Sequence, residues 1–224
     1  MGQVIGDLLP LAVAVAVSPI PIIAAILMLL SPRARSTSLG FLLGWLVGII
    51  AAVVVFTLLG SLIATGDDDA PAPVAGIIKI VLGALLVLLA LGQWRKRPKP
   101  GQEPALPPWM AAIDSMKPAA SAGLGFLLAA VNPKNLMMAA AAGVTIGGSQ
   151  LSGGADVAAI VVYVVLAAST VAIPVIAFLI AAAALRPRLD ALRVWLVANN
   201  ATVMAVLLLV IGVVTIGKGI GAFS

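Results

Sequence analysis

The sequence contains no cysteine and no histidine, and only 9% of its 224 residues are charged. The absence of cysteine excludes disulfides, thiol redox chemistry and thiolate metal sites. Without histidine, and without acidic residues inside the long apolar runs, the sequence shows no pairing of a nucleophile with a base. These absences predict a protein that is not an enzyme, needs no cofactor and holds no metal.

Apolar residues dominate instead, at 62% of the chain, with a mean hydropathy of +1.22. A helix that crosses a membrane needs roughly 20 consecutive, mostly apolar residues. Six runs meet this requirement: Leu8–Leu30, Leu39–Ala64, Val74–Trp94, Ala119–Ile146, Val157–Leu185 and Val194–Gly217. The sequence therefore predicts an all-α polytopic membrane protein with six transmembrane helices.

Lysine and arginine gather in three of the segments between these runs. The three groups are Arg33 with Arg35, Arg95 to Lys99 with Lys117, and Arg186 with Arg188 and Arg193. Because cytoplasmic loops retain positive charge, we expect the three basic loops to lie in the cytoplasm and both termini to face outside. The net charge of +5 then reports topology, and we expect no nucleic-acid partner. Residues 108–118 and 185–195 also show helical spacing of apolar residues, and each could form a short interfacial helix.

Prolines interrupt two of the runs near their middle, at Ser18-Pro19-Ile20-Pro21 and Asn132-Pro133-Lys134-Asn135. Proline removes a backbone donor, and in hydrocarbon the freed groups need polar neighbours or a cavity. A shift of 114 positions superimposes the two motifs, and a shift of 120 superimposes residues 85–92 on 205–212. Matching segments thus occur in the same order in the two halves of the chain, and a unit of three spans that is repeated once must have opposite orientations in the membrane. The sequence therefore predicts two inverted three-helix repeats, residues 1–94 and 119–224, joined by a basic, proline-rich cytoplasmic linker at 95–118.

The second half of each interrupted run should begin at the bilayer midplane, where a helix N-terminus attracts anions. Lys134 adds a full charge at this depth, where insertion costs about 2.5–3.5 kcal/mol, so it should face a polar cavity or a partner. We expect a substrate site formed by Ser18, Pro19, Pro21, Asn132, Pro133, Lys134 and Asn135. In the alternative interpretation, Lys134 only bonds carbonyls freed at the first break and has a structural role.

Other polar residues could line a pathway, namely Lys79, Ser169, Thr170 and Asn199. Lys79 is close enough to the outer end of its run to reach the interface, and Asn199 is typical of residues that bond between helices. Pro174 should kink the fifth run, and Ser169 and Thr170 could satisfy the opened backbone.

Gly40, Gly44 and Gly48 form a smooth face with a spacing of four residues. Small residues at this spacing allow close contact between membrane helices. We expect the contact to lie inside one protomer, and a homodimer is the alternative.

The motifs Ser18-Pro19-Ile20-Pro21 and Asn132-Pro133-Lys134-Asn135 resemble those of the lysine-exporter superfamily of transporters. Within it, the chain is most similar to the GAP family, the glycolipid-addressing proteins named for glycopeptidolipid and sulfolipid export. The similarity includes Ser31-Pro32-Arg33-Ala34 and Trp94-Arg95-Lys96-Arg97.

This resemblance implies a secondary transporter that exports an anionic lipid, a glycolipid or a small amphipathic anion around Lys134. Two alternatives stay open. One is an exporter of amino-acid-type small solutes, and the other is a non-transporting accessory subunit that works with a larger lipid-export machinery.

Overall fold

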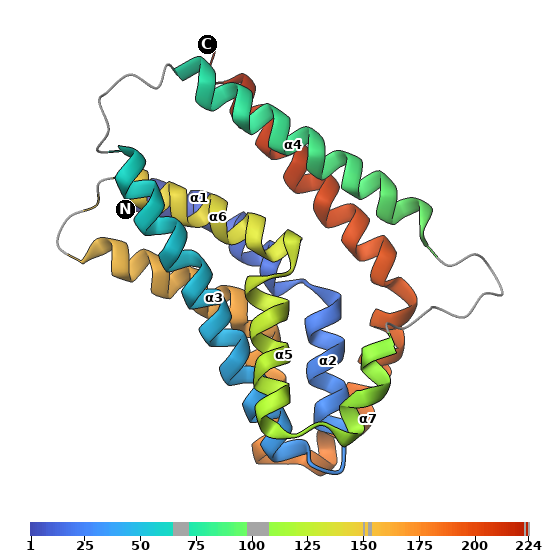
Figure 1. Ribbon diagram of the computed structural model, residues 1–224. Helices are drawn as coiled ribbons and strands as arrows, with labels where there is room; N and C mark the ends of the chain where they lie inside the picture. The colour runs from blue at the N-terminus through green and yellow to red at the C-terminus, as the bar shows by residue number, and fades with distance from the viewer. Residues whose placement is uncertain (65–71, 98–107, 150, 152–153, 222, 224) are drawn as a thin grey trace. The chain divides into compact units, whose positions relative to one another are not determined.

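The computed structural model describes residues 1–64, 72–97, 108–149, 151, 154–221 and 223 (Figure 1). Every regular element in these ranges is helical, which confirms the predicted all-α class. The elements are α1 (Gly2–Ala16), α2 (Pro19–Leu30), α3 (Ala34–Ala64), α4 (Ala72–Arg95), the 3-10 helix η1 (Pro108–Ser115), α5 (Pro118–Ala130), α6 (Pro133–Gly148) and α7 (Ala155–Ile220).

Two of the described helices, α3 and α7, are long and apolar enough to cross a membrane. The pairs α1–α2 and α5–α6 also qualify if each bent pair counts as one span. Large apolar side chains point outward from these helices, among them Leu43 and Leu58 of α3 and Val165 and Ile173 of α7. Such a surface is unusual for a protein in water, whereas lipid tails are as apolar as these side chains. The structure is that of a helical membrane protein.

The chain divides into two compact units. Met1–Ala64 and Ala105–Val197 form the first unit, and Thr65–Pro104 and Ala198–Ser224 form the second. Both broken helix pairs belong to the first unit, where α1 packs against α6 and α3 packs against both α5 and α6. The division into repeats 1–94 and 119–224 stays a prediction.

The glycine face of α3 is used inside the first unit. A Cβ added to Gly44 would lie only 1.9 Å from the carbonyl oxygen of Ala122 in α5. A Cβ added to Gly125 of α5 would lie 2.3 Å from the carbonyl oxygen of Phe41 in α3. The two backbones therefore touch without intervening side chains, and the predicted internal contact is confirmed.

Helix α7 differs most from the sequence-based expectation. The sequence predicts two spans, 157–185 and 194–217, and allows a short helix at 185–195 between them. The backbone is helical throughout 186–193, so this helix is present, and it is continuous with the helix on either side of it. Arginine, leucine and alanine fill most of this segment and are favourable helix residues. The described backbone of α7 leaves helical values at Ala181 (φ −136°, ψ 51°), and a kink at Pro174 stays a prediction.

Two smaller differences concern the first run and the segment before α5. The first helix begins at Gly2 and not at Leu8. Residues 108–115 form η1, whose Met110 and Ile113 side chains are buried and which packs against α2. The expected amphipathic helix is therefore present, and part of its apolar side is covered by protein.

Candidate functional site

Both predicted breaks are present. The axes of α1 and α2 differ by 50°, and those of α5 and α6 differ by 61°. Pro19 and Pro133 each occupy the first position of the helix that follows the break. At this position a missing amide hydrogen costs little, and the fixed φ of proline suits a helix start. Each proline therefore begins a new helix as well as ending the old one.

At the first break, the amide of Ser18 donates to the carbonyl oxygen of Val15 at 3.2 Å, three residues back instead of four. The carbonyl of Ala14 thereby loses its usual helical donor. Lys134 replaces this donor, because its Nζ donates to the Ala14 carbonyl oxygen at 2.6 Å and to Ser18 Oγ at 2.5 Å. The Lys134 side chain is only 6% exposed, so the two bonds hold a buried ammonium group.

The second break solves the same problem with an asparagine. The amide of Asn132 donates to the carbonyl oxygen of Leu127 at 3.1 Å, which leaves the carbonyl of Leu128 without its usual donor. Asn135 Nδ2 donates to this Leu128 oxygen at 2.9 Å. Asn135 Oδ1 in turn accepts a hydrogen bond from Ser18 Oγ at 3.1 Å. Asn135 therefore completes its own break and ties it to the first one.

The helix starts at the two breaks differ in the backbone donors that they offer. In α6, Asn132 Oδ1 accepts a hydrogen bond from the amide of Lys134 at 3.1 Å and caps the helix. In α2, Ser18 makes no side-chain cap, and Pro19 and Pro21 have no amide hydrogen to donate. The start of α2 is therefore poor in donors for an anion, and the charge of Lys134 is the main positive feature between the breaks.

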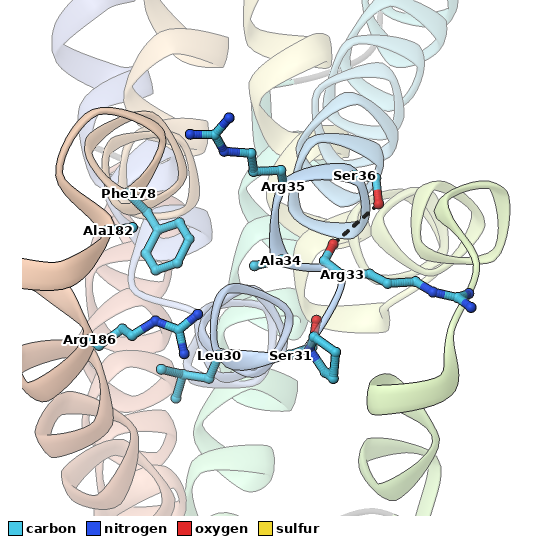
Figure 2. Close-up of a pocket in the computed structure, with 10 residues that line it drawn as sticks. Leu30, Ser31, Arg33, Ala34, Arg35, Ser36, Phe178, Ala182 and Arg186 are labelled. Carbon is cyan, nitrogen blue, oxygen red and sulfur yellow. Dashed lines mark hydrogen bonds between the residues drawn. The ribbon is translucent and has the colours of Figure 1, made fainter.

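A cavity of about 630 Å³ lies at the other end of α2 (Figure 2). The connection between α2 and α3 and the kinked middle of α7 form its walls, and its lining includes Leu30, Arg35, Phe178 and Arg186. The sequence assigned these arginines to topology alone. No local sequence motif predicts the cavity, because its walls come from segments almost 150 positions apart in the chain.

Comparison with protein families identifies the family of this chain. Residues 8–221 match the family described as Sap, sulfolipid-1-addressing protein. The chain belongs to this family. The match includes both breaks and all three basic segments, and it confirms the similarity to glycolipid-addressing proteins that the motifs indicate. No curated protein and no solved structure matches the chain significantly.

In this member of the Sap family, the residues expected to line a pathway fall into two groups. Thr170 lies in the first unit, and its Oγ1 donates to the carbonyl oxygen of Ala16 at the end of α1. Ser169 Oγ donates within α7, to the carbonyl oxygen of Leu166 at 2.7 Å. The sequence suggested that these two hydroxyls would bond the backbone groups freed by Pro174, but both bond other carbonyls.

Lys79 and Asn199 both belong to the second unit. Lys79 lies in α4, but its side chain is outside the part of the structure that is described. Asn199 lies in α7 and is half-buried. Their roles in a pathway stay predictions, whereas Ser18, Lys134 and Asn135 form one hydrogen-bonded cluster.

Proposed function

We propose that the protein is a secondary transporter of an anionic lipid or glycolipid in the bacterial plasma membrane, with its substrate site between the two broken helices. The observation that carries the proposal is the bond from Lys134 in α6 to the carbonyl oxygen of Ala14 in α1. It places a buried cation where two interrupted helices meet, an arrangement that secondary transporters use near the membrane midplane. The family name, sulfolipid-1-addressing protein, supports a lipid with an anionic headgroup.

In this proposal, the chain has six spans in two inverted three-helix repeats, with both termini outside. The kink at Ala181 separates the fifth span from the sixth within α7. The packing of α1 against α6 supports the inverted arrangement, because it pairs the first half of one broken helix with the second half of the other. Consequently, the basic segments face the cytoplasm.

The charge of Lys134 supports an anionic substrate over a zwitterionic one. Its two partners among the described residues, the Ala14 carbonyl and the Ser18 hydroxyl, are both neutral. Among the described residues, no carboxylate bonds the Lys134 ammonium group, and none at this position could pair with the ammonium group of an amino acid. A sulfate or phosphate ester would supply the missing negative charge.

A transport step follows from the same bonds. With the Lys134 side chain buried, the two breaks are held together in a closed state. A charged acceptor bonds an ammonium group more strongly than a neutral carbonyl does, so an arriving headgroup would displace Ala14 from Lys134. Losing that bond frees α6 to move against α1, and such a movement would alternate access to the two sides.

The test is lipid flipping by purified protein in liposomes, with sulfated galactosylceramide as substrate and unsulfated galactosylceramide as the matched control. Lys134→Gln removes the charge, and we expect sulfated-lipid transport below saturation to fall about tenfold to hundredfold, the worth of one charge-assisted hydrogen bond. Lys134→Arg should retain part of the activity, because guanidinium also binds sulfate.

The melting temperature separates this role from the structural alternative. Lys134→Gln also leaves the Ala14 carbonyl short of a donor, so some loss of stability is expected, and transport must be compared per folded molecule. A less stable Lys134→Gln variant with normal transport would give Lys134 a structural role only. A wild-type protein that moves no lipid would favour the accessory-subunit alternative.

A further inference from the structure

We propose that the cavity at the end of α2 binds the sulfate or phosphate ester headgroup of a membrane lipid, at a site distinct from the two breaks. The inference rests on the proposed function only for the class of lipid. All of the lining residues belong to the first unit, so one compact body builds the site. Its volume of about 630 Å³ is within the usual range for small-molecule sites, about 300–1,000 Å³.

The charge of the cavity is positive. Arg33, Arg35 and Arg186 line it, and its lining includes no acidic residue. Figure 2 shows the side chains of Arg35 and Arg186 on two sides of the Phe178 ring, whereas the side chain of Arg33 points away. Guanidinium groups match the oxygen geometry of sulfate and phosphate and can bond them in a bidentate manner.

The nearby acidic group on α7 does not neutralise these arginines. Asp190 forms an ion pair with Arg193, with 2.9 Å between Arg193 Nη2 and Asp190 Oδ1. Among the described residues, no carboxylate pairs with Arg35 or Arg186. The cavity therefore presents two cations whose charge an anionic headgroup can balance.

Backbone donors add to this charge. Helix α3 begins at Ala34, and the first four amides of a helix have no acceptor within it. Two of these amides belong to Arg35 and Ser36, which both line the cavity. The positive end of the α3 dipole and the arginine side chains therefore act on the same space.

The apolar part of the lining favours a lipid over a free ion. Leu30, Phe178 and Ala182 contribute apolar surface. The guanidinium carbon of Arg186 lies 5.7 Å from the centre of the Phe178 ring, a cation–π contact that positions the arginine beside this surface. A headgroup in the cavity would thus have apolar surface beside it for its tails.

In the proposed topology, this cavity lies at the cytoplasmic end of α2, and Pro19 at the first break begins the same helix. A helix of 12 residues is about 18 Å long. The cavity therefore fits the position where a lipid made on the cytoplasmic side is captured before it reaches Lys134.

The experiment measures binding of sulfated galactosylceramide to the full-length protein in nanodiscs of zwitterionic phosphatidylcholine, by native mass spectrometry. Arg35→Gln and Arg186→Gln should each weaken binding about tenfold, as expected for one lost charge-assisted hydrogen bond. Arg188→Gln is the matched control, because it removes the same charge from α7, two residues from Arg186, and Arg188 is exposed and does not line the cavity. It should bind as the wild type does, and unsulfated galactosylceramide should bind weakly to all variants.

Three outcomes would overturn the inference. Unchanged binding by the Arg35→Gln/Arg186→Gln double variant would place the headgroup elsewhere. Equal losses in all three single variants would indicate general surface attraction. Displacement of the lipid by inorganic sulfate at an equal concentration would make the site one for a free ion.

Lys134→Gln separates the two proposals. It should bind the lipid in the cavity as the wild type does, but it should transport it slowly. Slow transport by Lys134→Gln together with normal binding by the arginine variants would retain the proposed function and reject the cavity. Normal transport by Lys134→Gln together with weak binding by the arginine variants would reject the proposed role of Lys134 and retain the cavity as a lipid site.

Discussion

Ala14 and Leu128 hold equivalent positions in the two bent helix pairs, and the carbonyl oxygen of each accepts a hydrogen bond from a side chain of α6. Lys134 supplies the donor to Ala14, and Asn135 supplies the donor to Leu128. Each carbonyl lies five residues before the proline that starts the next helix. The first turn of α6 therefore supplies the side-chain donor at both breaks. The two helix pairs are bent at equivalent positions, but only the second pair provides these donors.

A third bond at the breaks comes from α7, and its removal should lower stability. Thr170→Val keeps the shape of the side chain but takes the donor from the buried Ala16 carbonyl. An unsatisfied buried carbonyl costs about 1–3 kcal/mol. Thr145→Val is the control, because the Thr145 hydroxyl bonds Ala141 within its own exposed helix turn. Thermal melting in detergent should show a clear loss for Thr170→Val alone, and equal melting of both variants would contradict this account.

The contact between α3 and α5 gives a second prediction. Gly44→Ala would place a methyl group 1.9 Å from the Ala122 carbonyl oxygen, so the two helices must separate. Overpacking of this kind costs about 1–3 kcal/mol or more. Gly123→Ala adds the same methyl group to α5 at a position where no atom of a neighbouring helix lies within 4 Å, and it should leave stability unchanged or raise it by up to about 1 kcal/mol. If both variants melted alike, the close contact would be wrong.

The positions of the breaks could be predicted from sequence because proline acts locally. Pro19 and Pro133 lack a backbone donor wherever the chain places them, and a glycine stripe such as that around Gly44 leaves a smooth face in any helix. The helix at 185–195 could be predicted in the same way, because its apolar residues recur at helical spacing. Its continuity with the neighbouring helices was not predicted, because Pro187 indicated a boundary, whereas arginine, leucine and alanine favour a helix and the backbone is helical throughout 186–193.

The partners of the polar side chains could not be predicted from sequence. Lys134 finds Ala14 across 120 positions, and Thr170 finds Ala16 across 154. Such pairs depend on how the helices cross. Both acceptors are backbone carbonyl oxygens, which every residue carries, so the sequence does not distinguish the one that is used. The cavity between Arg35 and Arg186 has the same origin, because two segments that read only as cytoplasmic loops are brought together by packing.

The last prediction concerns movement between the breaks. Ser18 Oγ and Asn135 Oδ1 lie 3.1 Å apart, and the natural chain has no cysteine. The Ser18→Cys/Asn135→Cys variant therefore contains only two thiols, which oxidation or a short thiol-specific reagent should join. If transport requires α6 to move away from α1, the joined protein should flip no sulfated lipid in liposomes. Reduction of the same preparation should restore the activity that the double variant has before oxidation.

The reduced double variant is its own control, because it carries both substitutions without the crosslink. Each single-cysteine variant should be insensitive to the oxidant. Because the crosslink fixes the two breaks at their observed separation, loss of transport would tie the cycle to their separation. Full transport by the joined protein would mean that the breaks stay together throughout the cycle, and a lipid would then have to pass by a route that does not include Lys134.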